Sequence, residues 1–132
     1  MASNKHLKLT IAIPSYNRNL VLKDNIQKLL EQINDQIEII VIDNFSDTPI
    51  EQTLENELQE YPQLKVIRNI ANIGLSANII RCFEVCNTKW VWLLSDDDTV
   101  ETLAVEKIIE QIENNENTFY KTFLQIILRI KT

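Results

Sequence analysis

The stretch EIIVID, residues 38–43, sets the fold class of this chain. Its four consecutive apolar residues between two acids are typical of a strand that is covered on both faces, as in a parallel sheet. Similar short strands are predicted before it at residues 7–14 (LKLTIAIP) and after it at 65–68 (KVIR) and 89–94 (KWVWLL). The stretch is therefore one strand of a sheet that the rest of the chain completes.

Apolar residues recur at helical spacing between these strands and after the last one. The second of the four predicted helices is expected to start with a capping box, with Thr48 as the cap, Pro49 as the first helical residue and Glu51 as the reciprocal acid. Strands that alternate with helices predict an α/β fold with a mainly parallel sheet and helices on both faces. The apolar stripes are Leu22, Ile26, Leu29, Leu30 and Ile33; Ile50, Leu54 and Leu58; Leu75, Ile79 and Phe83; and Val105, Ile108, Ile109 and Ile112.

Length and composition limit the function classes to which the chain can belong. It has 132 residues, the size of one domain, and its single glycine excludes the Gly-rich loops of P-loop and dinucleotide-binding proteins. Its single histidine, His6, excludes His-pair zinc protease motifs and C2H2 fingers. A net charge of −6 argues against nucleic acid as a partner. Chemistry is therefore expected from carboxylates, amides and hydroxyls, together with a bound cation.

Cysteine usage and the lack of long apolar stretches indicate where the protein works. Cys82 and Cys86 lie four residues apart in a helical pattern, where neither a disulfide nor a zinc site is expected. Buried free thiols fit a reducing compartment. No signal peptide and no membrane-spanning stretch stand out in the sequence. We expect a cytoplasmic protein, with peripheral attachment at the inner face of the membrane as a further option.

Polar side chains follow each of the four predicted strands. The first strand ends in PSYNR (14–18), the second in DN (43–44), the third in RN (68–69) and the fourth in SDDD (95–98). Ligands of open α/β sheets bind at the carboxyl ends of the strands. An aromatic residue, an acid, an arginine and an acid cluster at these ends predict a site for a nucleotide with its phosphates.

Three consecutive acids, Asp96, Asp97 and Asp98, follow the last apolar strand. Such a cluster needs a cation or hydrogen bonds to compensate its charge. In an extended segment Asp96 and Asp98 would face one ligand while Asp97 points away. Mg²⁺ or Mn²⁺ prefers such oxygen ligands and shares them with water and substrate phosphate. The alternative is helix capping, because Asp98 and Glu101 match a capping pattern; three acids against a buried strand favour the metal.

Three other strand-end residues each have a structural alternative. Asp43 could accept from ribose hydroxyls or a base N–H, or it could form a turn with Asn44 and Ser46. Tyr16 could pack on a base, or it could only fill the rim of the site. Arg68 could reach a base or a phosphate, or it could pair with a surface acid. Their positions at consecutive strand ends, rather than any one residue, carry the functional interpretation.

Four motifs of the chain resemble those of the family 2 glycosyltransferases in order and spacing. They are IPSYNR (13–18), EIIVIDNFSD (38–47), NIGLSAN (72–78) and LSDDD (94–98), and the resemblance covers about residues 9–113. It implies a Rossmann-like GT-A fold that binds a nucleotide-diphospho-sugar through a DxD motif and a divalent cation, Mn²⁺ or Mg²⁺. The donor that we expect is a UDP-sugar, and the acceptor would be a glycan, a lipid or a protein.

The resemblance also implies roles for single residues. Pro14, Tyr16 and Asp43 would contact the base and ribose, and Arg68 would lie near the base. Asp96 and Asp98 would bracket the ribose and the metal, with Asp98 as the direct ligand. The full substrate-binding set is Pro14, Tyr16, Asn17, Asp43, Arg68, Asn78, Asp96 and Asp97, and the metal ligands are Asp98 and Asp96.

The chain departs from the family pattern in two places. Ser76 and Ala77 stand where the family often has Ala-Arg, so a basic contact is missing. The chain also ends soon after the helix that follows the DxD motif, and no candidate base follows Glu116. We therefore expect residues 1–113 to be a truncated nucleotide-sugar-binding domain, with the catalytic base in the part of the transferase that would follow. The alternative is a non-catalytic domain that binds nucleotide-sugar without turnover.

Residues 114–132 are expected to form a loop and an apolar C-terminal tail. We expect the tail to mediate self-association into a homo-oligomer, because large exposed apolar patches commonly mark an interface. The alternatives are that it folds back on its own chain, or that its basic residues hold it on a membrane surface. Its apolar seam, with steps of four, three and four as in a short coiled coil, is Phe119, Phe123, Ile126 and Ile130.

Overall fold

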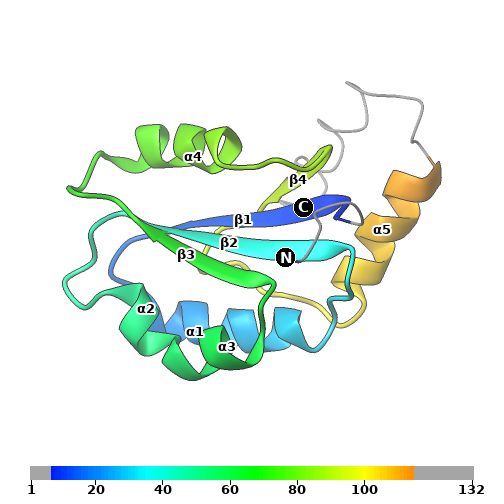
Figure 1. The fold of residues 1–132 in the computed structure, drawn as a ribbon, viewed down its shortest axis with the longest axis horizontal. Helices are drawn as coiled ribbons and strands as arrows, with labels where there is room; N and C mark the ends of the chain where they lie inside the picture. The colour runs from blue at the N-terminus through cyan, green and yellow to red at the C-terminus, as the bar shows by residue number, and fades with distance from the viewer. Residues whose placement is uncertain (1–6, 115–132) are drawn as a thin grey trace.

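The computed structural model describes residues 7–114, whose strands form one parallel sheet (Figure 1). The strands are β1 (Leu9–Ser15), β2 (Ile37–Asp43), β3 (Leu64–Arg68) and β4 (Trp90–Leu93). They lie side by side in the order β3-β2-β1-β4, and every neighbouring pair is parallel. The predicted α/β fold with a parallel sheet is confirmed.

The parallel register brings the carboxyl ends of the strands to one edge of the sheet. Ser15 pairs with Asp43, and Asp43 pairs with Arg68, so three strands end level with one another. β4 pairs with β1 as far as Leu93, and the acidic residues follow directly. β2 is buried along its whole length, because it has a strand on each side and helices on both faces. Polar groups of β2 can therefore reach solvent only beyond the ends of the strand.

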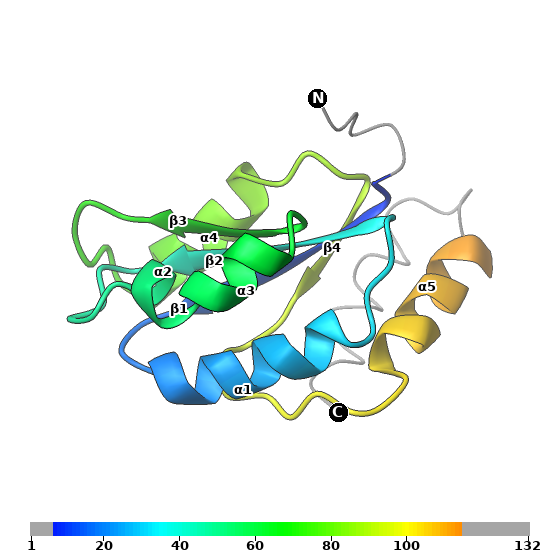
Figure 2. The ribbon, with the colours of Figure 1, turned by 60° about the horizontal axis from the view of Figure 1, so that its bottom comes forward.

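Helices cover both faces of this sheet (Figure 1, Figure 2). One face carries α1 (Asn19–Leu30), α2 (Ile50–Thr53) and α3 (Glu55–Glu60), and the other carries α4 (Leu75–Glu84). α5 (Ala104–Asn114) lies beyond β4 and contributes apolar residues to the same core as α1. A smaller core under α4 includes Ala12, Ile42 and Cys82. Each fully buried Leu or Ile of these cores contributes about 1.5–3 kcal/mol of transfer free energy, which fixes the strand ends in place.

The second predicted helix begins differently from the expectation. Pro49 is the N-cap with φ −54° and ψ 130°, and no side-chain cap bond forms, so the predicted capping box is wrong. The N–H of Ile50, the first helical residue, instead donates to the buried carboxylate of Asp43 at 3.1 Å. A cap that comes from the end of β2 cannot be found from local spacing alone. The helix is also interrupted at Leu54, which separates α2 from α3.

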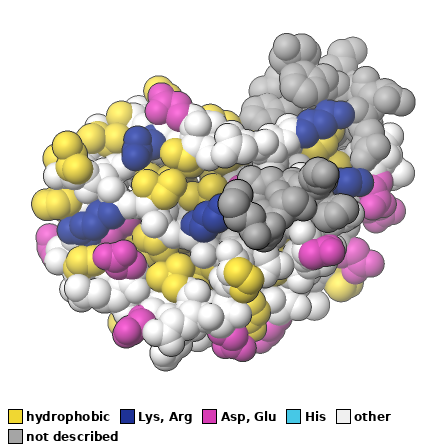
Figure 3. All heavy atoms as spheres, in the orientation of Figure 1, with side chains coloured by type: hydrophobic (Ala, Val, Ile, Leu, Met, Phe, Trp, Pro, Cys, Tyr) yellow, Lys and Arg dark blue, Asp and Glu magenta, His cyan; other side chains and the backbone are white. Residues whose placement is uncertain are grey.

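The described residues form no large basic patch on the face in Figure 3, and both cysteines are free thiols. On the part of the face in Figure 3 that the described residues form, Lys and Arg side chains are dispersed among acidic and apolar ones. Cys82 is buried and Cys86 partly buried, both as free thiols, and burial raises their pKa values to about 12 and about 11.

Within residues 7–114 no helix is long and apolar enough to cross a bilayer. The apolar tail at residues 119–130 lies outside the described residues, so its self-association stays a prediction.

Candidate functional site

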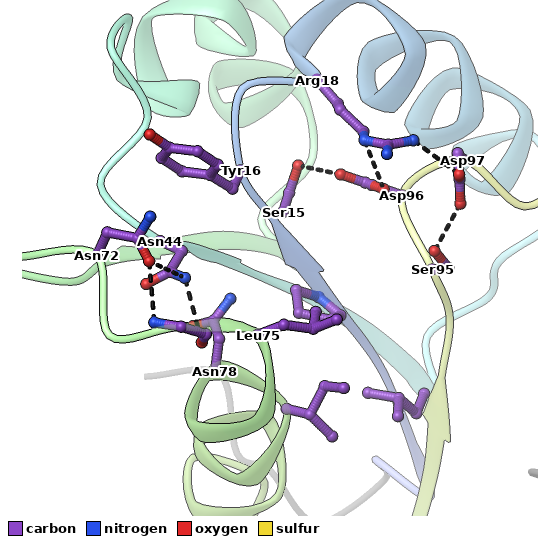
Figure 4. A pocket seen from close by; sticks show the side chains of 14 residues that line it. Ser15, Tyr16, Arg18, Asn44, Asn72, Leu75, Asn78, Ser95, Asp96 and Asp97 are labelled. Atoms are coloured by element: carbon purple, nitrogen blue, oxygen red, sulfur yellow. Dashed lines mark hydrogen bonds and ion pairs between the residues drawn. The ribbon is translucent and has the colours of Figure 1, made fainter.

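A cavity of about 490 Å³ opens at the carboxyl edge of the sheet, between β1, β4 and the start of α4 (Figure 4). Arg18 and the acids lie on one side of it, and asparagines lie on the other, with Tyr16 near the latter. Its apolar lining includes Pro14, Leu75 and Leu93. The polar lining is Ser15, Tyr16, Arg18, Asn44, Asn72, Asn78, Ser95, Asp96 and Asp97.

The segment after β4 forms a tight turn rather than the extended segment that the sequence suggested. The N–H of Asp98 donates to the carbonyl of Ser95 at 3.2 Å, and the carboxylate of Asp98 accepts from the N–H of Ser95 at 3.1 Å. The side chain of Asn25 on α1 holds the turn by donating to the carbonyls of Asp96 and Asp98 at 2.9 and 2.8 Å. Consequently Asp96 and Asp97, not Asp96 and Asp98, line the cavity.

The helix-capping alternative for Asp98 is also not what the structure contains. α5 starts only at Ala104, and Asp98 closes the turn onto Ser95 instead. The N–H of Val105 in the first turn of α5 is capped by the side-chain oxygen of Gln32 at 3.2 Å. The acid cluster is therefore free of a role at a helix start.

Asp96 is the buried acid of the turn, and its side chain points to the end of β1. It is 7% exposed, and its Oδ2 accepts from the hydroxyl of Ser15 at 2.8 Å. Burial raises the pKa of Asp96 above its usual value, although the Ser15 bond and the charge of Arg18 act in the opposite direction. Because burial destabilises the charged form of Asp96, a further positive charge nearby would stabilise its carboxylate.

Asp97 is the exposed acid of the turn. Its Oδ1 accepts from the hydroxyl of Ser95 at 2.7 Å, and its Oδ2 accepts from Nη1 of Arg18 at 2.7 Å. These contacts hold the pKa of Asp97 below its usual value. Both acids of the cavity are therefore oriented by a serine each, one from β1 and one from the turn itself.

Asp43 lies at the end of β2 and is fully buried. Its carboxylate accepts from the N–H of Ser46 at 2.9 Å, the N–H of Ile50 at 3.1 Å and Nη1 of Arg68 at 2.8 Å. Burial raises the pKa of Asp43, but these hydrogen bonds outweigh it, so the pKa lies below its usual value. The turn with Ser46 that the sequence offered as an alternative is thus present. A contact with the nucleoside stays a prediction.

Arg68 contacts both the carboxylate of Asp43 and the ring of Phe45. The guanidinium lies 4.6 Å from the centroid of the Phe45 ring, within the range of a cation–π contact. Phe45 is 47% exposed and has φ 68°, which is unusual for a bulky residue and is held here by the turn that Asp43 and Ser46 close. Arg68 therefore pairs with a buried acid, not with the surface acid of the alternative interpretation.

Asn17 joins the β1 loop to the β2 loop rather than facing the cavity. Its N–H donates to the hydroxyl of Ser46 at 2.9 Å, and its side-chain oxygen accepts from the N–H of Asp47 at 2.8 Å. Its φ of 53° is in the left-handed region, which asparagine tolerates better than most residues. Asn17 thus fixes the loop that carries Tyr16.

A cluster of asparagine side chains forms the opposite wall. Asn69 donates to the side-chain oxygens of Asn44 at 3.0 Å and Asn78 at 2.8 Å. Asn78 donates in turn to the carbonyl of Ile42, and Asn44 donates to Asn72 at 2.9 Å. This cluster connects the ends of β2 and β3 to the first turn of α4 and keeps the wall in one arrangement.

Comparison with known proteins gives the family. The profile of Glycosyl transferase family 2 matches residues 10–127, most of the chain. This chain belongs to glycosyl transferase family 2. The family resemblance read from the four motifs is therefore confirmed.

Several curated proteins are similar to this family 2 chain. An uncharacterized glycosyltransferase of Haemophilus influenzae is 29% identical over 109 residues, which cover 83% of this chain and 36% of that protein. A dolichol-phosphate mannosyltransferase of Pyrococcus furiosus is 27% identical over 113 residues, covering 82% of this chain and 31% of that protein. The chain thus spans about a third of the length of these relatives.

Solved structures share the fold at low sequence identity. Staphylococcus aureus TarS has a TM-score of 0.73 at 18% identity, over 83% of this chain and 33% of that one. The mannosyltransferase PcManGT of Pyrobaculum calidifontis, in complex with GDP-Man and Mn²⁺, has a TM-score of 0.71 at 14% identity, over 83% and 34%. These matches confirm the Rossmann-like GT-A architecture of the family 2 chain.

The cavity fits a divalent cation only if substrate phosphates and water supply part of its ligands. Within residues 7–114 no group of three or more His, Cys, Asp or Glu side chains is arranged to hold a metal. Asp96 and Asp97 nevertheless present carboxylate oxygens at the cavity wall, and Mg²⁺ is usually bound by one or two carboxylates together with substrate phosphates and water. The residues present therefore fit a cation that arrives with a diphosphate.

The structure brings together some predicted residues and adds others. Those that line the cavity are Pro14, Tyr16, Asn78, Asp96 and Asp97, while Asn17, Asp43, Arg68 and Asp98 support it from behind or beside. Sequence reasoning assigned no binding role to Ser15, Arg18, Asn44, Asn72 and Ser95. Four of these stand in the strand-end segments, so the strand-end rule could have included them. Asn72 stands in the NIGLSAN motif, which no local rule connects to β2.

Proposed function

We propose that this chain is the donor-binding part of a glycosyltransferase that takes a nucleotide-diphospho-sugar and a divalent cation. The observation that carries the proposal is the cavity itself, with two oriented carboxylates on one wall and a tyrosine and buried amides on the other. A diphosphate with its cation suits the acidic wall, and a nucleoside suits the aromatic and amide wall. Neighbouring folds that hold GDP-Man with Mn²⁺ and, in TarS, UDP-GlcNAc support this class of donor.

Each part of the site then has a role in holding the donor. Pro14 and Tyr16 would pack against the nucleoside, with Asp43 and Arg68 behind them at the ends of β2 and β3. Asn17 and Asn78 would keep the two loops of the cavity in register. Asp96, Asp97 and Asp98 would surround the ribose, the diphosphate and the cation. We propose a UDP-sugar as the donor.

The reaction is displacement at the anomeric carbon of the donor. A hydroxyl of the acceptor forms the new C–O bond while the bond to the nucleotide diphosphate breaks, and the hydroxyl proton passes to a base. That base would come from parts of the protein beyond residues 7–114. A bound Mn²⁺ or Mg²⁺ supplies positive charge that stabilises the departing diphosphate. The chain's own part is to orient Asp96 through Ser15 and Asp97 through Ser95 before the donor arrives.

The acceptor and the location belong to the same proposal. A glycan, a lipid or a protein would supply the hydroxyl, bound by the two thirds of the relatives' length that this chain does not span. Free Cys82 and Cys86 fit the reducing cytoplasm, which is the location that we propose.

Calorimetric titration of UDP, GDP and CDP in the presence of Mn²⁺ tests the proposal. We expect UDP to bind, and the affinity to fall when EDTA removes the cation. A parallel assay of UDP-sugar hydrolysis separates a catalytic chain from a domain that binds without turnover. If none of the nucleotides binds with Mn²⁺ present, the chain is not a donor-binding domain and the proposal is wrong.

A further inference from the structure

Arg18 faces the acids that would bind the cation. Among the described residues that line the cavity it is the one basic side chain. It extends from the loop between β1 and α1 to the turn after β4, with Nη1 2.7 Å from Oδ2 of Asp97 and Nε 4.0 Å from Oδ1 of Asp96 (Figure 4). One guanidinium thus contacts both carboxylates.

Two serines and Arg18 contact the two carboxylates, and the N–H of Tyr16 donates a further hydrogen bond to Asp96. Ser15 donates to Oδ2 of Asp96 and Ser95 donates to Oδ1 of Asp97, at 2.8 and 2.7 Å. The remaining oxygens, Oδ1 of Asp96 and Oδ2 of Asp97, face the guanidinium. Since each serine already binds one oxygen of its acid, the oxygens that face Arg18 have more of their lone pairs left for a cation. The guanidinium of Arg18 thus lies where a cation would contact these two oxygens.

We propose that Arg18 is an internal counter-ion that competes with the divalent cation for Asp96 and Asp97. The inference rests on the proposed function. Before the donor arrives, the guanidinium balances the two carboxylates and keeps the acidic turn in shape. A cation bound at the same two oxygens would weaken these ion pairs, since it would repel the guanidinium at this short distance. The side chain of Arg18 is 53% exposed, so it is free to move away.

The displaced guanidinium then has a second partner. A diphosphate on the cation presents anionic oxygens to the same wall, and a planar guanidinium binds such oxygens with two parallel N–H bonds. Binding of the nucleotide diphosphate thus offsets the loss of the carboxylate contacts. Cation and nucleotide consequently strengthen each other's binding through Arg18, and by linkage the effect is equal in both directions. Arg18 is a positioning residue in this account.

The variant R18Q tests this with readouts other than turnover. Binding of Mn²⁺ alone is measured by electron paramagnetic resonance of the free ion, and UDP binding at saturating Mn²⁺ by calorimetry. R18Q is expected to bind Mn²⁺ alone about 2- to 5-fold more tightly, the range for a partly exposed ion pair, and to bind UDP more weakly. The affinities for Mn²⁺ and for UDP are thus expected to change in opposite directions, whereas a variant that only damages the fold would lower both.

Two further variants make the result specific. K28Q removes one positive charge from an exposed pair with Asp24 on α1, and it is expected to leave both affinities unchanged. R18K keeps the charge without the planar fork, and its Mn²⁺ affinity is expected to lie closer to that of the wild type than to that of R18Q. Thermal melts of all variants establish that the fold is retained.

The outcomes separate this inference from the proposed function. If the wild type binds Mn²⁺ and UDP but R18Q binds Mn²⁺ no more tightly, Arg18 is not a competing counter-ion and the donor site stands. If R18Q weakens both ligands, Arg18 only supports the acidic turn and the inference is wrong. If the wild type binds neither ligand, both the donor site and the role of Arg18 are refuted.

Discussion

Asp43 is expected to stabilise the fold as strongly as any polar residue of the site. Its buried carboxylate holds the N–H groups of Ser46 and Ile50 and the guanidinium of Arg68. The change to test is Asp43→Asn, which keeps the size of the side chain and removes its charge. Asp47→Asn, in the exposed part of the same loop, is the matched control.

The magnitude follows from the three contacts. Asparagine offers one acceptor oxygen, so it can hold one donor while its NH₂ group faces the others. A buried donor left without a partner costs about 1–3 kcal/mol, and a hydrogen bond to a charged group contributes about 1.5–3 kcal/mol. Because the Arg68 side chain is 27% exposed, water can hydrogen-bond to its guanidinium and reduce the cost of losing the ion pair. We expect Asp43→Asn to lower the free energy of unfolding by about 2–4 kcal/mol, and the control to change it by less than about 0.5 kcal/mol.

Urea unfolding followed by circular dichroism, repeated across acid pH, measures this. The pKa of Asp43 is lowered in the folded state, so the unfolded chain binds its proton more tightly. Its stabilising effect is thus fully present above the unfolded pKa, near 3.9, and is lost as pH falls through the folded value. The difference in free energy of unfolding between wild type and Asp43→Asn should therefore become smaller as the pH is lowered. Equal stabilities at neutral pH, or a gap that does not depend on pH, would refute this account.

The same variant tests the nucleoside contact. If Asp43 also accepts from the ribose or the base, UDP affinity should fall by about 1.5–3 kcal/mol, the range for a charged hydrogen bond, while pyrophosphate affinity changes little. Calorimetry at a temperature where the variant is folded gives both values. Equal losses for UDP and pyrophosphate would mean that Asp43 acts on the site only by holding its loops.

Three further predictions concern the acids and the tail. Asp97→Asn is expected to abolish Mn²⁺-dependent UDP binding, because Asp97 lines the cavity; if Asp98→Asn abolishes it and Asp97→Asn does not, the direct ligand is the acid that the family resemblance implies. Asp96→Asn is expected to stabilise the fold at neutral pH, because a raised folded pKa lowers stability as pH rises through it, and urea midpoints over pH measure this. For the tail, light scattering should give an oligomer for the full chain and a monomer for a chain that ends at Asn117. A full chain that stays monomeric at high concentration would favour a tail that folds back.

Local sequence patterns were enough to predict the elements of the sheet and the edge at which the site lies. The apolar run at residues 39–42 is typical of a strand buried on both faces, and the structure has β2 there. Once the strands are parallel, their carboxyl ends must meet at one edge. The strand-end residues Tyr16 and Asp96 could therefore be assigned to one cavity from their order alone.

The contacts of individual side chains at that edge could not be predicted from local patterns, because they depend on how distant segments pack. Alternation along an extended segment would pair Asp96 with Asp98, but Asn25 from α1 binds the carbonyls of a tight turn and brings Asp97 to the cavity instead. Asp43 likewise caps α2, which local spacing assigned to Thr48. The pairing of Arg18 with Asp97 joins residues 79 positions apart. Local patterns encode which face a residue prefers, whereas a hydrogen bond between distant segments depends on how the loops pack, and that is determined only when the whole chain folds.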